Sequence, residues 1–369
     1  MVAAQRYPLE FNGILASAPG FSLPRAAVAE AWDVQALTSA ASDAGMPAAE
    51  GRSTAKREDP RATAALARAF SDEDLALVSR AVLDACDADD GLVDGIVGSF
   101  TQCSTQKVGP KLNRLRCTRD QTPECLSSAQ INALERVYAG PRDSKGRSLY
   151  SDWPWDAGIA SFGWRLWKLG SVDGAMDAMN VSTGGASLAS VFTTPPTPLP
   201  NDIRAQYDFS KQFDFDHDAP KIYATSAAFA HSAWDDISAR SSDLSGFRAR
   251  GGKLLVPHGV SDPVFSINDT LAWYQEVDRR TAGKADTFAR VFPVPGMNHC
   301  GGGVATDRFD AFASLVSWVE QGRAPDRIIA HAGPGAPWPD RERPLCPYPK
   351  VARYKGTGNT ERADSFVCR

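Results

Sequence analysis

Two polar residues near the C-terminus, Asp262 in "HGVSDPVF" and His299 in "PGMNHCGGG", each follow an apolar run that predicts a buried strand. In open α/β sheets, sites form at the carboxyl ends of the strands. An aspartate that accepts from one imidazole nitrogen fixes the tautomer and stabilises the imidazolium, so that the other nitrogen can deprotonate a hydroxyl. The alternative is structural: Asp262 caps the following helix, and His299 is a turn histidine bonded to the backbone.

A hydroxyl nucleophile for this pair is expected earlier in the chain, on a strand-to-helix turn of the form G-x-S-x-G. The stretch "NVSTGG" imitates the motif at Ser182, but Asn180 stands in place of the first glycine and no buried strand precedes it. We therefore interpret Ser182 as a loop residue. The order Asp then His on successive strands still matches the end of the α/β-hydrolase order Ser…Asp…His.

A second candidate site is the stretch "CDADDGLVDGI", where Asp87, Asp89, Asp90 and Asp94 lie within eight residues. Carboxylates this close together are solvated or bind a hard cation, and Ca²⁺ takes six to eight oxygen ligands. The stretch lacks the spacing and terminal glutamate of an EF-hand loop. The sequence alone leaves a calcium site and a solvated turn as alternatives.

The seven cysteines lie at Cys86, Cys103, Cys117, Cys125, Cys300, Cys346 and Cys368. Their spacing allows three local disulfides, within 86–103, 117–125 and 346–368, in an oxidising compartment. Cys300 is then left over. Seven reduced thiols in a cytosolic protein are the alternative. Without a C-x-x-C pair, and with scattered histidines, a zinc cluster is not expected.

The bulk composition is that of a globular protein, with 369 residues, 43% hydrophobic and 23% charged. This length favours two domains, or one domain with a large insertion. The net charge of −4 gives no reason to expect a nucleic acid or an anionic membrane as a partner. No run of about 18 apolar residues is present, so no membrane span is expected. The first residues, "MVAAQRYPLEF", do not have the pattern of a signal peptide.

The elements that must position these residues alternate near the C-terminus. Residues 251–262 and 288–300 predict buried strands, and residues 268–283 and 307–322 predict helices. Such alternation is typical of a parallel sheet with helices on its faces. Earlier in the chain, residues 1–7 predict the end of a helix and "NGILASAPG" predicts a strand. Two helices are expected over 71–87 and 127–140, with Ser71 and Ser127 as their N-caps. The stretch from 140 to 220 is rich in Trp, Gly and Pro and is expected to be irregular.

Several stretches together resemble the tannase/feruloyl esterase family of α/β-hydrolases: "AQRYPLEFNGILASAPG", "CDADDGLVDGI", "HGVSDP", "PGMNHC" and "RPLCPYPKVARYKG". The stretches "DWPWDAG" and "FDFDHDAPKIYATS" resemble in particular the members that hydrolyse the terephthalate monoester of ethylene glycol. The resemblance implies an α/β fold, the C-terminal portion of a hydrolase parallel sheet with a large inserted lid domain. Residues 1–35 and 250–369 would then form the hydrolase domain, and residues 36–249 the lid.

The same resemblance implies that the chain begins after the family's nucleophile elbow, so that the serine, the oxyanion-hole donors, the first strands and a signal peptide lie on a preceding segment. The complete protein would be secreted or periplasmic. Cys300 would pair with a cysteine beside the absent serine. The local disulfides would be Cys86–Cys103, Cys117–Cys125 and Cys346–Cys368.

Further residues take roles by the resemblance. A structural Ca²⁺ would be held by the side chains of Asp87, Asp90 and Asp94 and the backbone carbonyls of Leu92 and Ile96. The acyl pocket would be lined by the aromatic side chains of Trp167, Phe192 and Phe265.

The chain departs from its terephthalate-monoester relatives where their carboxylate-binding arginine falls, on or beside Asn180. An ester of an aromatic acid of the feruloyl or galloyl type is therefore expected as substrate. A non-catalytic, calcium-stabilised binding module, or one half of a two-chain enzyme, is the alternative function.

Overall fold

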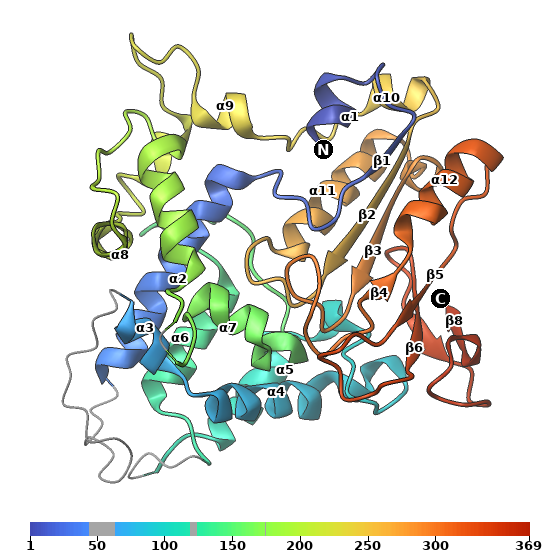
Figure 1. The fold of residues 1–369 in the computed structure, drawn as a ribbon, viewed down its shortest axis with the longest axis horizontal. Helices are drawn as coiled ribbons and strands as arrows, with labels where there is room; N and C mark the ends of the chain where they lie inside the picture. The colour runs from blue at the N-terminus through green and yellow to red at the C-terminus, as the bar shows by residue number, and fades with distance from the viewer. Residues whose placement is uncertain (44–62, 119–123, 174) are drawn as a thin grey trace.

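A computed structural model describes residues 1–43, 63–118, 124–173 and 175–369. Two regions are distinguishable in it: a sheet with flanking helices formed by the chain's two ends, and a helical region formed by the residues between (Figure 1). None of the helices in the described residues is both long and apolar enough to cross a membrane.

The central sheet is parallel and has the order β1-β2-β3, formed by β1 (Gly13–Leu15), β2 (Lys253–Gly259) and β3 (Ala289–Val294). The connection from β2 to β3 runs through α11 (Ile267–Arg280), and α12 (Ala311–Gln321) follows β3. β2 is buried along almost its whole length, as expected of a parallel strand covered on both faces. The predicted strand–helix–strand–helix order is confirmed.

The ends of these two helices follow from local sequence. Ser266 precedes α11 and its hydroxyl accepts from the N–H of Asn268, while Asp310 caps α12 by accepting from Ala313. Such caps satisfy backbone donors that have no partner inside the helix. Gly322 ends α12 with a φ of 69°, a conformation that glycine adopts without strain.

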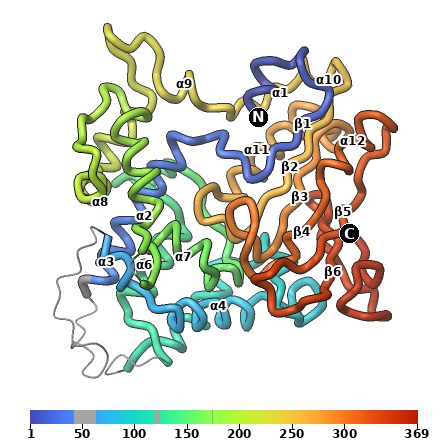
Figure 2. Tube along the Cα trace, in the orientation of Figure 1, coloured from blue at the N-terminus to red at the C-terminus, as the bar shows by residue number. Residues whose placement is uncertain are grey.

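The helical region lies between β1 and β2 in sequence, and α2 (Leu23–Asp43) runs through its middle (Figure 2). The predicted N-caps of α4 (Asp72–Cys86) and α6 (Ser128–Ala139) are both present as capping boxes, formed by Ser71 with Asp74 and by Ser127 with Gln130. The other helices of this region are α3 (Ala64–Ala69), α5 (Thr105–Arg114), α7 (Phe162–Lys168), α8 (Ile203–Gln212), α9 (Ala233–Ile237) and α10 (Ser245–Ala249).

The stretch from 140 to 220 differs from its prediction as irregular chain. It contains α7, α8 and two π-helical segments, η4 (Asn180–Gly185) and η5 (Leu188–Phe192). These helices are short and rich in Gly, Ser and Trp, so they give no sustained 3.6-residue period. Buried aromatic residues anchor the stretch: Trp155 stacks on Tyr138 with ring centroids 3.8 Å apart.

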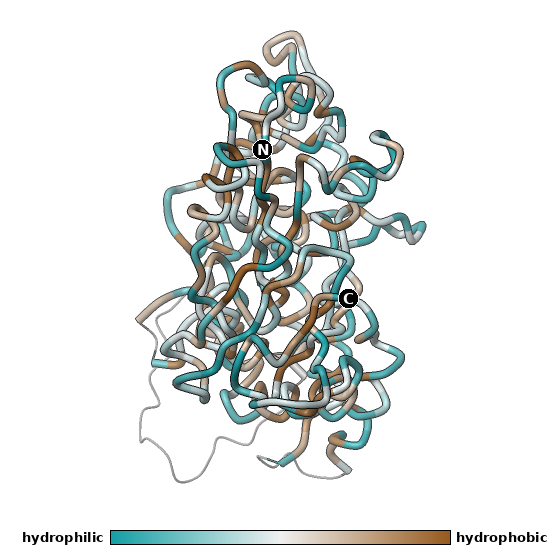
Figure 3. Tube along the Cα trace, turned by 90° about the vertical axis from the view of Figure 1, so that its right-hand side faces the viewer, coloured by the Kyte–Doolittle hydropathy of each residue, from teal (hydrophilic) through white to brown (hydrophobic). Residues whose placement is uncertain are grey.

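The C-terminal part adds two small antiparallel sheets, β4-β5-β6 and β7-β8. Their strands are β4 (Arg308–Phe309), β5 (Ile328–His331), β6 (Glu342–Leu345), β7 (Ala352–Tyr354) and β8 (Phe366–Cys368). At the N-terminus, the chain begins with the short helix α1 (Val2–Arg6). The most hydrophobic residues run through the interior of the trace rather than along its outer loops (Figure 3).

Three disulfides are present, and they are the three expected pairs, Cys86–Cys103, Cys117–Cys125 and Cys346–Cys368. Cys300 is exposed and unpaired in the described chain. The expected boundary between residues 35 and 36 falls inside α2, because this helix runs unbroken from the sheet side into the helical region.

Candidate active site

Asp262 and His299 meet at the carboxyl edge of the parallel sheet. β2 ends at Gly259 and β3 at Val294, and the loop after each strand carries one of the two residues. His299 Nδ1 lies 2.8 Å from Asp262 Oδ2, within hydrogen-bond distance. Asp262 is fully buried, whereas the side chain of His299 is 24% exposed. The pair therefore has a buried orienting carboxylate and an imidazole that is open on its other side.

Asp262 is held as an anion by several donors. Its Oδ1 accepts from the backbone N–H groups of Val264 (2.8 Å) and Phe265 (3.0 Å). Burial raises the pKa of Asp262, but hydrogen bonds from His258 and His299 outweigh it and lower the pKa to about 2. The alternative reading of Asp262 as a helix cap is not what the structure has, because Ser266 caps α11.

His258 is a participant that the sequence reading passed over as one of the scattered histidines. It is fully buried at the end of β2, and its Nε2 lies 3.4 Å from Asp262 Oδ2. The same Nε2 lies 3.0 Å from the carbonyl of Phe265, and Nδ1 lies 3.0 Å from the hydroxyl of Thr270. These contacts assign the proton to Nε2, so His258 is a second donor toward Asp262. The sequence feature that could have identified His258 as a partner of Asp262 is its position four residues earlier, at the end of the same strand.

The free nitrogen of His299 faces Cys300, whose Sγ lies 3.8 Å from Nε2. Burial lowers the pKa of His299, but the hydrogen bonds and charges of Asp262 and Cys300 outweigh it and raise the pKa to about 10. Cys300 also has a φ of 60°, which few residues other than glycine adopt. Among the described hydrogen bonds of His299, none comes from a serine or threonine hydroxyl.

The stretch "DWPWDAG" brings a second carboxylate, that of Asp156, under both loops. Asp156 Oδ2 accepts from the N–H of Gly296 (2.6 Å) and from the hydroxyl of Ser261 (2.9 Å), and its Oδ1 accepts from its neighbour Ala157 (2.8 Å). Burial raises the pKa of Asp156 to about 6, although these hydrogen bonds act against the rise. Ser261 precedes Asp262 and Gly296 precedes His299 by three residues, so Asp156 ties the two loops together.

Asn298 makes a second connection between the same segments. Its Nδ2 donates to the carbonyl of Ser261 at 3.2 Å, and its Oδ1 accepts from the hydroxyl of Ser161. Gly158 allows this close approach, since a Cβ there would lie 2.4 Å from Ser261 Oγ. Both loops therefore rest on residues 156–161 of the helical region.

Two of the three expected pocket aromatics lie against His299. The ring of Trp167 is edge-on to the imidazole with centroids 5.8 Å apart, and the ring of Phe265 is 5.2 Å away in a similar arrangement. Phe192 is partly buried in a different cluster, against Leu188 and Phe213, and no described ring contact links it to His299. The place of Phe192 in a substrate pocket therefore stays a prediction.

Ser182 lies in η4 with an exposed side chain, so it is helical rather than the loop residue expected. No strand in the described residues leads into η4, so the strand-to-helix turn of a nucleophile elbow is absent there. This placement agrees with its rejection as a nucleophile.

The acidic loop is folded around its own carboxylates. Asp87, Asp90 and Asp94 are largely buried, and Asp94 forms an ion pair with Arg343. The backbone donors to the three side chains are Asp94 and Gly95 for Asp87, Leu92 and Gly98 for Asp90, and Ile96 for Asp94. Burial, together with the charges of Asp94 and Asp87, raises the pKa of Asp90 to about 6.

These oxygens have the hard-donor chemistry that Ca²⁺ takes, and no described ion pair supplies Asp87 or Asp90 with a cation. Over the residues described, no three His, Cys, Asp or Glu side chains are grouped closely enough in this structure to hold a metal ion, so a Ca²⁺ site in this loop stays a prediction. The expected carbonyl ligand Ile96 accepts from the N–H of Gly98 at 3.0 Å.

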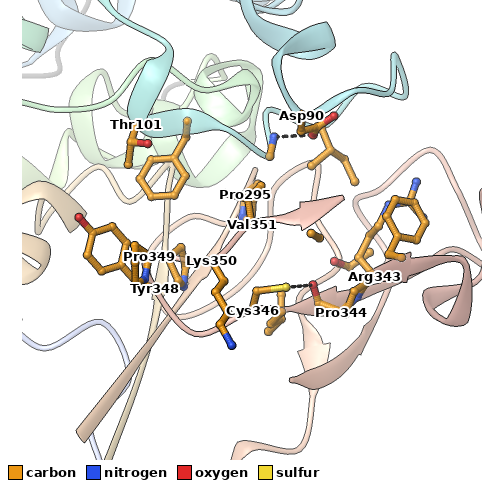
Figure 4. A pocket seen from close by; sticks show the side chains of 18 of the residues that line it. Asp90, Thr101, Pro295, Arg343, Pro344, Cys346, Tyr348, Pro349, Lys350 and Val351 are labelled. Carbon is orange, nitrogen blue, oxygen red and sulfur yellow. Dashed lines mark hydrogen bonds between the residues drawn. The ribbon is translucent and has the colours of Figure 1, made fainter. Parts of the chain in front are cut away.

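The loop is also fastened to the C-terminal strands. Arg341 donates to the carbonyl of Asp94 at 2.6 Å, and Arg353 donates to the carbonyl of Asp89 at 2.7 Å. A pocket opens between the loop and β6, lined by Asp90, Arg343 and a row of C-terminal residues (Figure 4). Neither Asp262 nor His299 lines this pocket, so it is separate from the candidate active site.

Comparisons with known proteins agree with this geometry. A family model described as tannase and feruloyl esterase matches residues 51–369. A mono(2-hydroxyethyl) terephthalate hydrolase from Piscinibacter sakaiensis is 42% identical over 100% of this chain and 61% of its own length. A probable feruloyl esterase from Arthroderma benhamiae is 27% identical, also over 100% of this chain and 61% of its own length.

Solved structures show the same fold. Feruloyl esterase B from Aspergillus oryzae matches with a TM-score of 0.66 at 22% identity, over 100% of this chain and 66% of that one. Tannin acyl hydrolase from Aspergillus niger matches with a TM-score of 0.64 at 18% identity, over 61% of its length. The chain thus spans about three fifths of the curated relatives it matches. It belongs to the tannase and feruloyl esterase family of carboxylic ester hydrolases.

Proposed function

We propose that these residues form the base-bearing part of a serine carboxylic ester hydrolase that acts on esters of aromatic acids. The observation that carries the proposal is the Asp262–His299 hydrogen bond of 2.8 Å, at the carboxyl edge of a parallel sheet and beside two aromatic rings. The sheet and the helical region would be the C-terminal portion of an α/β-hydrolase domain and its lid.

In this mechanism, His299 Nε2 takes the proton from a serine hydroxyl supplied by a segment outside the 369 residues. The serine oxygen attacks the ester carbonyl, and the imidazolium is stabilised by the ionised Asp262, whose pKa is about 2. His299 then gives its proton to the leaving alcohol, which leaves an acyl-enzyme. Water hydrolyses this intermediate by the same steps, with His299 again as base and then acid.

The imidazole must be neutral before it can act as the base. The thiol of Cys300 contributes to the raised pKa of His299 through its contact with Nε2. A disulfide between Cys300 and a cysteine beside the nucleophile would remove that contact and would leave Nε2 facing the serine. This pairing lowers the pKa of His299 and brings the base and the nucleophile together.

An aromatic acyl group would fit beside His299, because the rings of Trp167 and Phe265 lie 5.8 and 5.2 Å from its imidazole, centroid to centroid. A substrate ring placed there could pack against these two aromatic side chains. Phe192 would complete this pocket. By the resemblance, the position of the carboxylate-binding arginine of the terephthalate-monoester members falls on or beside Asn180. The substrate is therefore expected to be a feruloyl or galloyl ester rather than a terephthalate monoester.

The decisive test is a burst assay with p-nitrophenyl and feruloyl esters. The 369-residue chain alone should release no burst of alcohol, because removal of the nucleophile leaves little beyond binding. Joined to a family N-terminal segment that carries the serine, it should show a burst that His299→Ala abolishes and Ser182→Ala leaves intact. A burst from the chain alone that Ser182→Ala removes would contradict the proposal.

The second candidate function is a non-catalytic, calcium-stabilised binding module, or one half of a two-chain enzyme. The open edge of the parallel sheet, where β1 pairs only with β2 in the described residues, favours the two-chain enzyme and argues against an independent module. An unpaired edge tends to associate with another strand. A monodisperse monomer that binds aromatic esters would support the module, and activity only with a separate second chain would support the two-chain enzyme.

We further propose that the acidic loop binds Ca²⁺ through the side chains of Asp87, Asp90 and Asp94 and the carbonyls of Leu92 and Ile96. The ion would neutralise buried carboxylates and brace the contact between the helical region and the C-terminal strands, with no part in the chemical step. Addition of EGTA should lower the melting temperature, and Ca²⁺ should restore it. An unchanged melting temperature would remove the proposal.

The three disulfides support a secreted or periplasmic location, where an oxidising environment maintains such bonds. The 369-residue chain folded in that compartment should show one titratable thiol, that of Cys300, after denaturation. Several thiols would contradict the location.

A further inference from the structure

Among the buried polar atoms that have no hydrogen-bond partner in the described residues, several lie on α2, just before it, or on the neighbouring η4. They are Ser22 Oγ, Glu30 Oε2, Asp33 Oδ1, and Asn180 Oδ1 and Nδ2. Buried polar groups in native proteins are nearly always paired, because an unpaired one costs about 1–3 kcal/mol. A concentration of such atoms in one place indicates that their partners are bound molecules.

Glu30 and Asn180 lie on two elements that pack against each other, α2 and η4. The carboxyl of Glu30 on α2 lies against Gly184 of η4, so closely that a Cβ on Gly184 would be 1.5 Å from Glu30 Oε2. Asn180 lies four residues before Gly184, about one turn of this helix, and its amide is fully buried. Both buried side chains therefore lie along the contact between α2 and η4.

This contact adjoins the candidate active site. Asp33, one turn after Glu30 on α2, pairs with Lys168, which directly follows the pocket residue Trp167. The charges that act on Glu30 are those of Lys168, Asp33, His299 and Asp262. An acyl group that stacks on Trp167 with its ester at His299 would point its far end toward Glu30.

The site offers hydrogen bonds without a net positive charge. Burial raises the pKa of Glu30 to about 8, so its carboxyl carries a proton at neutral pH and can donate as well as accept. Asn180 supplies one amide donor group and one acceptor. The charge of Lys168 is already taken by Asp33. Such a site suits an uncharged hydroxyl and disfavours a carboxylate.

We propose that Glu30 and Asn180 form a specificity subsite for a neutral hydrogen-bonding substituent, a phenolic hydroxyl, on the acyl ring of the substrate. This inference rests on the proposed function, because it assumes that the acyl group lies on Trp167. The hydroxyl would give and accept hydrogen bonds that the two side chains otherwise lack. A ring without the hydroxyl would leave them unpaired.

The test compares two esters that differ by one hydroxyl, methyl 4-hydroxycinnamate and methyl cinnamate. Their dissociation constants are measured at pH 7 by quenching of tryptophan fluorescence in the 369-residue chain, which should bind without hydrolysis. The hydroxylated ester should bind about tenfold more tightly. Mono(2-hydroxyethyl) terephthalate, which ends in a carboxylate, should bind no better than methyl cinnamate.

The preference, measured as the ratio of the two dissociation constants, should disappear in Glu30→Met and in Asn180→Leu, whatever each variant does to binding of the ring itself. Glu30→Gln, which keeps the shape and a neutral amide, should retain most of the preference. A matched control on the same helix is Thr38→Val, which removes a hydroxyl bonded to Tyr207 at 2.9 Å and should leave the preference intact.

The outcomes separate this inference from the proposed function. Equal and measurable binding of both esters by the wild-type chain would overturn the subsite and leave the aromatic pocket standing. A preference that survives Glu30→Met and Asn180→Leu would also overturn it and would assign the unpaired atoms to water. No binding of either ester would contradict the aromatic pocket itself.

Discussion

The buried ion pair between Lys168 and Asp33 should be the most costly single contact to break in the helical region. The side chains are 1% and 0% exposed, and the ammonium of Lys168 also lies over the ring of Trp153, 4.9 Å from its centroid. Lys168 ends α7 and Asp33 lies in α2, so the pair fixes the helix that carries Trp167.

The size of the stability loss on breaking this ion pair follows from its burial. Removal of one partner of a buried ion pair leaves an uncompensated charge and destabilises by about 3–5 kcal/mol. Oδ1 of Asp33 already has no partner, and burial raises the pKa of Asp33 even with Lys168 present. We expect Lys168→Met to lower the free energy of unfolding by about 3–5 kcal/mol. Total stabilities are about 5–15 kcal/mol, so the loss is large.

The loss should also depend on pH. Without Lys168 the pKa of Asp33 rises further in the folded state, so the folded protein binds a proton more tightly than the unfolded chain does. When the pKa of a carboxyl group is higher in the folded state than in the unfolded chain, the protein becomes less stable as the pH rises. The destabilisation by Lys168→Met should therefore be greater at pH 8 than at pH 5.

Urea unfolding followed by tryptophan fluorescence measures the effect. The double variant Lys168→Met, Asp33→Leu, which removes both charges, should recover most of the loss, because a buried pair replaced by apolar groups is often neutral. The matched control is the pair of Lys107 and Asp89, 2.6 Å apart but 41% and 21% exposed. Lys107→Met should cost less than about 1 kcal/mol.

Two results would refute this reasoning. A loss below about 1 kcal/mol for Lys168→Met would place the ion pair in the class of surface pairs. A double variant as unstable as the single variant would show that shape, rather than charge, makes Lys168 necessary.

The remaining predictions concern the candidate active site. The pKa of Asp262 is lowered to about 2, so its contribution to stability is present above about pH 4 and is lost as the pH falls through 2. Asp262→Asn should therefore flatten the acid limb of a curve of unfolding free energy against pH. The raised pKa of His299 gives stability that is present below about pH 6.5 and lost as the pH rises through 10, so His299→Gln should flatten the alkaline limb. Cys300→Ala removes a contact that raises the pKa of His299, so an NMR titration should show that pKa lower than in the wild type; an unchanged value would contradict the role of the thiol. Asp156→Asn replaces one acceptor by an amide donor that faces Gly296 N–H, so the imidazole signals of His299 should shift and broaden, whereas Asp202→Asn, which preserves a remote helix cap, should leave them unchanged.

Much of the fold could be predicted from the sequence, because the decisive signals are local. The helix starts at Ser71 and Ser127 follow from side chains that reach backbone donors three residues away. The two late strands follow from uninterrupted apolar runs, since a strand covered on both faces needs apolar residues at every position. The helices between 140 and 220 could not be predicted, because they are short and are held by aromatic contacts with distant residues.

For the candidate site, the sequence by itself determined the types and the order of the chemical groups: an aspartate and then a histidine after successive parallel strands, cysteines spaced for three local bridges, and an acidic loop. Parallel strands place their carboxyl ends at one edge whatever the rest of the chain does, so Asp262 and His299 had to lie near each other.

Only the tertiary structure decided which residues support them. His258 shares the carboxylate of Asp262 because β2 and the turn after it bring the two together, and Asp156 reaches under both loops from more than 100 residues away. The burial that raises the pKa of Glu30 comes in part from the packing of α2 against η4. Such contacts join segments far apart in the sequence, and no local pattern of residues encodes the desolvation that sets their pKa values.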